Sequence, residues 1–144
     1  MNSLFHFLSL FVLVLLSAPS FGSEWMTLDK ELVLKSGPKS LCPVGRAYAL
    51  SKKNVFLLGQ NHNFSLEKST APVEEKVEEG CTYKSESQVL ENKLVEKTER
   101  TKCPKAKENG IVEESVELKN GQLIYKNVFI NEASKRVEFE CLYQ

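Results

Sequence analysis

The fold class is indicated most clearly by ten residues in the last third of the chain, Val116-Glu117-Leu118-Lys119-Asn120-Gly121-Gln122-Leu123-Ile124-Tyr125. Two runs of alternating apolar and polar side chains flank Asn-Gly, the dipeptide typical of a two-residue type I′ turn. This turn predicts three cross-strand pairs: Leu118 with Leu123, Val116 with Tyr125, and Glu117 with Ile124. The first two pairs form an apolar face, which we expect to point inward. The stretch therefore predicts a β-hairpin.

The same alternation predicts further strands on both sides of this hairpin. Its second arm continues to Ile130, and residues 137–143 form a last strand with Cys141 on the buried face. Earlier strands are expected at residues 25–34, 55–58, 62–66, 77–83, 81–90 and 93–103, with a strand or short helix at 43–51. About eight or nine strands without a long helical period predict an all-β fold, an antiparallel sandwich or small barrel.

The cysteine contexts indicate an internal repeat. Cys42-Pro43 is echoed by Cys103-Pro104, and Cys81-Thr82-Tyr83 by Cys141-Leu142-Tyr143, at nearly equal spacings. We therefore expect two pseudo-repeats, at about residues 31–83 and 92–144. Because each repeat would carry its own bridge, the pattern favours disulfides between Cys42 and Cys81 and between Cys103 and Cys141. Intertwined halves would exchange these partners.

These Cys-Pro and Cys-x-Tyr elements carry a family resemblance. The chain resembles small exported bacterial domains of unknown function that open with Cys-Pro and close with Cys-x-Tyr, here duplicated. The resemblance implies a periplasmic or secreted disulfide-bonded domain, and it implies no catalytic residues.

The first 22 residues have the pattern of a signal peptide. An apolar run at residues 4–16 is followed by Pro19, and small residues precede a cleavage site after Gly22. The run is too short to cross a bilayer. Residues 23–144 are then a single mature β-rich domain, and all four cysteines lie in it, as expected of a secreted or periplasmic protein.

The charge balance excludes some classes of partner. The chain has 19 basic and 19 acidic side chains and no net charge, whereas proteins that bind nucleic acids or anionic membranes through electrostatics carry a basic excess. Four basic side chains cluster near one another: Arg100, Lys102, Lys105 and Lys107. Acidic residues flank them and no aromatic residue lies between them, so the cluster offers no platform for stacked bases.

Few residues suited to catalysis follow the signal peptide. His62 is the single histidine and Asp29 the single aspartate there, so a Ser-His-Asp or Cys-His site, a zinc site and a calcium loop all lack ligands. We expect His62 to be an exposed polar residue in a turn. No glycine-rich phosphate loop occurs, so no catalytic, metal or cofactor-binding residue and no cofactor is predicted.

Two remaining motifs are weaker. Adjacent glutamates occur at Glu74-Glu75, Glu78-Glu79 and Glu113-Glu114, but neighbouring residues of a strand point to opposite faces. Asn63-Phe64-Ser65 is an acceptor sequon, which makes Asn63 a candidate glycosylation site in a eukaryotic host.

These observations favour an exported, non-enzymatic binding protein, with another exported or envelope protein as its partner. A carrier of a small apolar ligand is the alternative if the strands close into a barrel with a cavity. A glutamate-dependent hydrolase is the third hypothesis. Nucleic-acid binding and a transmembrane anchor are not expected.

Overall fold

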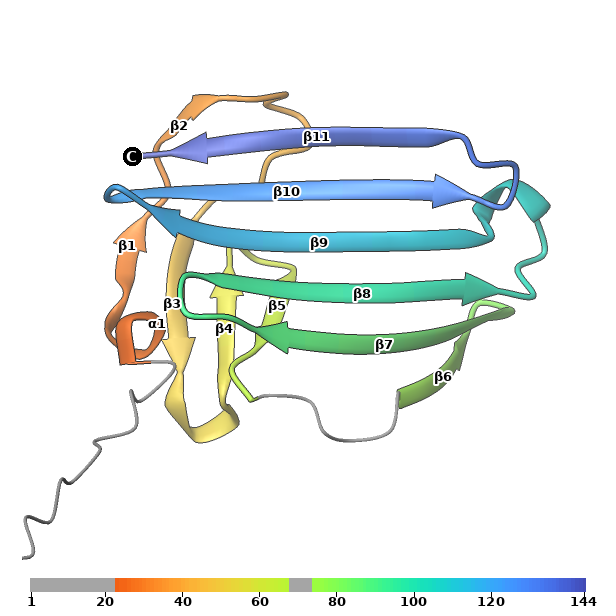
Figure 1. Cartoon of the computed structure of the whole chain (residues 1–144), viewed down its shortest axis with the longest axis horizontal. Coiled ribbons are helices and arrows are strands. Elements are labelled where there is room, and N and C mark those ends of the chain that lie inside the picture. Colours follow the sequence, from red (N-terminus) through yellow and green to blue (C-terminus); the bar gives the residue numbers. More distant parts are fainter. Residues whose placement is uncertain (1–22, 68–73) are drawn as a thin grey trace, which may run out of the picture.

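The computed structural model describes residues 23–67 and 74–144, so the predicted signal peptide lies outside the described residues. The described chain forms two open antiparallel sheets (Figure 1). The small sheet has the order β1 (Asp29–Glu31), β3 (Arg46–Leu50), β4 (Val55–Leu58) and β5 (His62–Ser65). The large sheet has the order β2 (Leu34–Ser36), β11 (Arg136–Tyr143), β10 (Gln122–Asn131), β9 (Gly110–Lys119), β8 (Lys93–Thr101), β7 (Cys81–Val89) and β6 (Glu74–Glu78).

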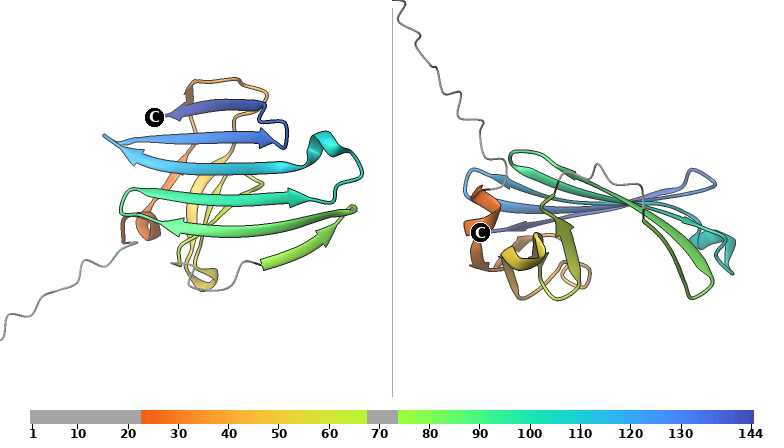
Figure 2. Two further views of the ribbon diagram at one scale, coloured as in Figure 1. Left: turned by 45° about the vertical axis from the view of Figure 1, so that its right-hand side comes forward. Right: turned by 90° about the horizontal axis from the view of Figure 1, so that it is seen from below.

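The two sheets form a sandwich in which one layer is shorter than the other. The small sheet lies against one half of the large sheet, and the long strands β7 to β11 extend beyond it (Figure 2). The all-β sandwich is thus confirmed, with eleven strands in the described residues. Over residues 23–67 and 74–144 the sheets do not close into a barrel, which is the geometry on which the carrier hypothesis depended.

The hairpin that indicated the fold is confirmed. β9 and β10 pair as predicted, with Leu118 opposite Leu123 and Val116 opposite Tyr125. Asn120 and Gly121 have φ values of 52° and 75°, the left-handed conformation that a type I′ turn requires at both positions. Val116, Leu123 and Tyr125 are fully buried, so the local pattern of this stretch correctly indicates its inward face.

Replacing Gly121 with alanine tests the turn. A Cβ atom at this position would meet nothing within 4 Å, so the substitution changes backbone strain and not packing. We expect the free energy of unfolding to fall by about 1 kcal/mol, the cost of a left-handed conformation for a residue with a side chain. Urea denaturation measures the change. Asn120→Gly is the control, because glycine adopts this conformation readily. An unchanged stability in Gly121→Ala would contradict the assigned turn.

The core lies between the small sheet and the covered half of the large sheet. Its largest fully buried side chains are Trp25, Tyr125, Tyr143, Phe56, Phe64, Leu58, Leu94 and Leu123. Trp25 comes from the short helix α1 (Ser23–Thr27), and its ring meets that of Phe56 edge to face with centroids 5.0 Å apart. The two short 3-10 helices, η1 (Ser51–Lys53) and η2 (Ala106–Glu108), contribute no buried residue.

The predicted strand at residues 25–34 is wrong. α1 places Trp25 in the core, and the chain then contributes β1 to the small sheet and β2 to the large one. Between them Leu32 donates its amide to Gly45, while Val33 accepts from Gln144. The regular strand is interrupted at Leu32 and Val33, where the chain crosses from the small sheet to the large one. The segment at residues 43–51, for which a strand or short helix was expected, contains β3.

All four cysteines form disulfides, but the predicted partners are wrong. The bridges join Cys42 to Cys141 and Cys81 to Cys103. The predicted strand at residues 77–83 is interrupted at Glu79 and Gly80, which both have positive φ, so that β6 and β7 form a hairpin. This turn places Cys81 beside the end of β8. The repeated motifs therefore do not correspond to two separately bridged units.

The Cys42–Cys141 bridge joins the loop before β3 to β11, and so links the two sheets. Near it the buried hydroxyl of Tyr143 donates a hydrogen bond to the carbonyl of Pro43 over 2.9 Å. Burial raises the pKa of Tyr143 well above its ordinary value, so this hydroxyl keeps its proton.

In residues 23–67 and 74–144, no helix has the length and apolar character needed to cross a bilayer.

Candidate functional site

The face of the large sheet that the small sheet packs against continues beyond the small sheet. The strand registers place six partly or fully exposed side chains on this continuation, which we call the open face: Tyr83, Arg100, Val112, Asn127, Phe129 and Val137. Val137 is 54% exposed, although it follows the same inward alternation as Cys141 and Tyr143. If the small sheet were longer, it would cover these side chains and they would belong to the core. Because it is short, this apolar surface is accessible.

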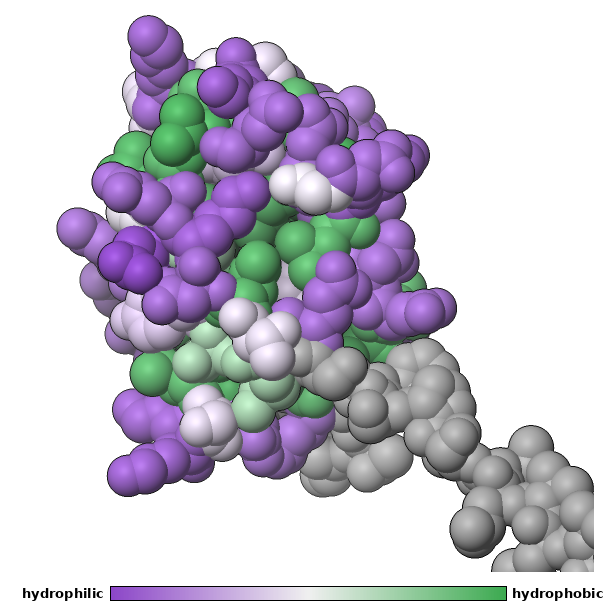
Figure 3. Space-filling view, turned by 90° about the vertical axis from the view of Figure 1, so that its left-hand side faces the viewer, coloured by the Kyte–Doolittle hydropathy of each residue, from purple (hydrophilic) through white to green (hydrophobic). Residues whose placement is uncertain are grey.

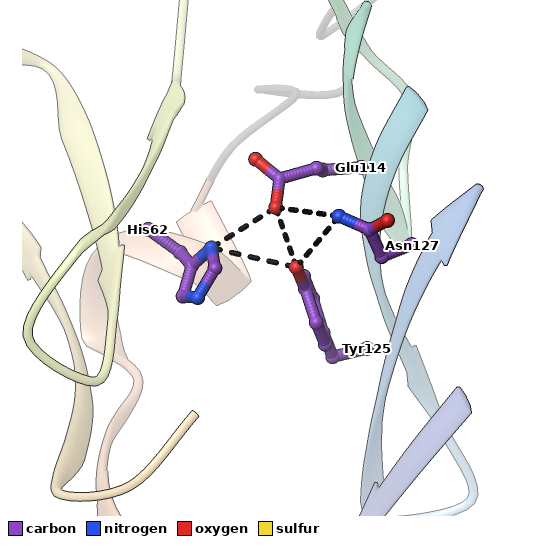
Figure 4. Close-up of polar contacts among 4 residues, drawn as sticks. All are labelled: His62, Glu114, Tyr125 and Asn127. Atoms are coloured by element: carbon purple, nitrogen blue, oxygen red, sulfur yellow. Dashed lines mark hydrogen bonds and ion pairs between the residues drawn. The ribbon is translucent and has the colours of Figure 1, made fainter. Parts of the chain in front are cut away.

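A polar cluster marks the border between the core and the open face. His62 at the start of β5 reaches across to Glu114 of β9, and Tyr125 and Asn127 of β10 join them (Figure 4). The Oε1 atom of Glu114 lies 3.0 Å from Nδ1 of His62 and accepts a hydrogen bond of 3.0 Å from Nδ2 of Asn127. It also accepts a short hydrogen bond from the hydroxyl of Tyr125. One carboxylate oxygen thus connects both sheets.

The cluster has a defined charge state at Glu114 and Tyr125. Burial alone would raise the pKa of Glu114, but hydrogen bonds from His62 and Tyr125 outweigh it and hold that pKa below its ordinary value. Burial, together with the hydrogen bond to the ionised Glu114, raises the pKa of Tyr125 far above its ordinary value. Glu114 is therefore a carboxylate at neutral pH, and Tyr125 is a neutral donor to it. We call these four residues, His62, Glu114, Tyr125 and Asn127, the polar clasp, because their contacts join the two sheets.

A shallow hollow of about 330 Å³ lies on the open face beside this clasp. It is lined by Arg100, Lys107, Glu108, Val112, Asn127 and Phe129. The guanidinium carbon of Arg100 lies 5.8 Å from the centre of the Tyr83 ring, and its Nε atom is buried without a hydrogen-bond partner. Buried polar groups are nearly always paired, so Arg100, which lines the hollow, has a donor without a partner.

The loop that contributes Lys107 and Glu108 is fixed at both ends. At its start the Cys81–Cys103 bridge ties it to β7. The backbone amide of Cys103 donates a hydrogen bond of 2.9 Å to the side-chain oxygen of Asn109, which closes the loop around η2. The disulfide thus holds the hollow's outer wall against the sheet.

Sequence reasoning misplaced His62. It is the first residue of β5, which agrees with the strand expected at residues 62–66, but its side chain is only 26% exposed and is hydrogen-bonded across the sheets, whereas an exposed turn residue was expected. The turn is confined to the preceding residues because His62 pairs with Leu58. The sequence contained a sign of the clasp. Glu114 and Asn127 fall on the same inward face of the predicted hairpin as Val116 and Tyr125, and polar side chains on a buried face need hydrogen-bond partners.

The other candidate residues are dispersed. Glu113 is exposed and points away from the face of Glu114, as predicted for neighbours in a strand. Glu78 pairs with Lys76 on the surface, 2.6 Å apart. Asn63 is exposed on β5, at the edge of the small sheet, and its glycosylation stays a prediction. The described residues contain no group of three or more His, Cys, Asp or Glu side chains arranged to hold a metal ion.

Hydrophobic residues also reach the surface elsewhere. Figure 3 shows them between hydrophilic ones at the end of the sandwich that carries α1 and the turn between β7 and β8. Met26 and Leu90 are exposed there. Scattered apolar residues of this kind are normal on protein surfaces.

No family model, curated protein or solved structure matches the chain in comparisons with known proteins.

Proposed function

We propose that the protein is an exported, non-enzymatic binding protein that holds another exported protein on its open face. The observation that carries the proposal is the unequal size of the two sheets, which leaves Val112, Phe129 and Val137 accessible on a rigid platform. Accessible apolar residues on one face of a sheet, rimmed by polar ones, are typical of protein-binding surfaces.

Three further features support this proposal. Two disulfides are typical of proteins in oxidising compartments outside the cytoplasm. Both bridges leave no cysteine free in the chain to act as a nucleophile. The imidazole of His62, the single histidine of the described residues, is engaged by Glu114 and Tyr125 in a contact between the sheets, which gives it a structural role.

Site-specific photo-crosslinking in the organism of origin tests the proposal. A benzophenone amino acid replaces Phe129 on the open face, and in a control variant it replaces Ile124 on the opposite face of β10. We expect irradiation to yield one defined adduct with an exported protein from position 129 and none from position 124. The same adducts from both positions, or no protein adduct from position 129, would contradict the proposal.

A further inference from the structure

The hollow on the open face has an uncompensated positive charge. Of its three charged residues, Glu108 forms an ion pair with Lys105 over 3.3 Å. Among the described residues, neither Arg100 nor Lys107 has a carboxylate partner. The two cations therefore create a local positive field that an anionic group would neutralise.

The opposite face of the same strands provides a contrast. A hollow there is lined by Lys84, Lys97, Glu86, Glu99 and Ile111. Two cations meet two carboxylates in it, and Lys97 lies 3.3 Å from Glu86. Charges on that face compensate one another, so the positive hollow is a local feature of the open face and not of the whole sheet.

The positive charge lies next to an apolar surface. Val112 and Phe129 line the same hollow as Arg100 and are neighbours across β9 and β10. Arginine binds carboxylates through paired N–H donors in one plane, while the valine and phenylalanine side chains can bury an apolar group beside it. The complementary ligand combines a carboxylate with an adjacent apolar group.

The shape of the surface favours a protein as the source of that ligand. Small molecules are mostly enclosed by their binding clefts, whereas this hollow is shallow and lies on a sheet face that continues to Val137. A small ligand would leave most of its surface in water. A protein segment can fill the hollow and also cover the face around it.

The geometry points to recognition of an acidic peptide segment, in which an aspartate or glutamate adjoins a large apolar residue. Its carboxylate pairs with Arg100 and Lys107, and its apolar side chain packs on Val112 and Phe129. This inference rests on the proposed function and specifies the chemistry of the partner.

Nuclear magnetic resonance titration with two blocked peptides tests the inference. The probes are acetyl-Gly-Phe-Glu-Gly-amide and its twin with Gln in place of Glu, added to the isotope-labelled, disulfide-intact protein. We expect the Glu peptide to shift the amide signals of Arg100, Lys107, Val112 and Phe129, and to bind about fivefold more tightly than the Gln peptide. Added salt should reduce this difference.

Variants locate the effect. Arg100→Gln should remove the preference for the Glu peptide, and Lys107→Gln on the exposed loop should reduce it without disturbing the fold. Lys97→Gln is the matched control, because Lys97 lies on the same strand as Arg100 but on the opposite face. Equal binding of the two peptides, shifts outside the open face, or no localised shifts at millimolar peptide would each overturn the inference.

The two proposals can fail separately. If crosslinking at position 129 identifies a partner while Arg100→Gln leaves the affinity for that partner unchanged, the acidic-segment inference is wrong and the binding function stands. If a carboxylate-bearing small molecule binds in the hollow and the Glu peptide does not, the inference is again wrong, because its ligand is a protein segment.

Discussion

Replacing Cys42 and Cys141 together with alanine should lower the free energy of unfolding by about 4 to 5 kcal/mol. The bridge closes a loop with a sequence separation of 99 residues, and the chain-entropy model assigns about 4.7 kcal/mol to a loop of that size. It also ties the loop before β3 to β11, so its loss removes the covalent link between the two sheets. Urea denaturation followed by tryptophan fluorescence measures the change, since Trp25 is fully buried in the core.

The second bridge provides the comparison. Cys81 and Cys103 are separated by only 22 residues, so the double alanine variant at these positions should lose about 3 kcal/mol in the same model. Its main effect should be local, on the loop that holds Lys107. If the Cys81 and Cys103 variant lost more free energy of unfolding than the Cys42 and Cys141 variant, the expectation that the longer loop contributes more would be wrong. Restored stability in a Cys42–Cys81 linked form would contradict the observed pairing.

The hairpins were predictable because their information is local. In β9 and β10 the Asn-Gly turn and the alternation of side chains determine the register within 16 residues of sequence from Glu113 to Val128. β7 and β8 were likewise expected as strands, at residues 81–90 and 93–103, and they pair with each other. In each case two neighbouring strands suffice, so the rest of the fold need not be known.

The disulfide partners and the layer assignment were not predictable in the same way. The turn at Glu79 and Gly80 separates β6 from β7 and places Cys81 next to Cys103. The repeated motif had instead suggested one continuous strand at residues 77–83. The assignment of β1 and β2 to different sheets depends on contacts with β3 and β11, which lie far along the chain. Sequence similarity between two segments does not determine which distant strand each of them meets.

The candidate site was only partly visible for the same reason. The inward positions of Glu114 and Asn127 follow from the register of one hairpin, but their partner His62 comes from the other sheet. The open face depends on how far the small sheet extends over the large one. No local pattern encodes that extent, because inward-facing apolar residues continue along β9 from Leu118 and Val116 in the covered half to Val112 in the uncovered half.

Replacing Glu114 with glutamine should lower the free energy of unfolding at pH 7 by about 3 kcal/mol. Hydrogen bonds to a charged acceptor contribute more than neutral ones, and this carboxylate accepts from Tyr125 and Asn127 and contacts His62. Because the folded protein lowers the pKa of Glu114 below its ordinary value of 4.5, its contribution is fully present above about pH 4.5. The contribution is lost as the pH falls through the lower folded pKa.

The stability difference between the native protein and Glu114→Gln should therefore narrow as the pH is lowered from 6 toward 3. The titratable groups of the described residues that face Glu114 are His62 on β5, Glu96 on β8 and Tyr125 on β10. They remain in both proteins, so the difference reports the carboxylate of Glu114 together with its interactions with these groups. Glu113→Gln is the matched control: its side chain is exposed on the other face, and its loss should stay within about 0.5 kcal/mol at every pH. A difference for Glu114→Gln that stays constant between pH 3 and 7 would show that its carboxylate charge does not hold the two sheets together.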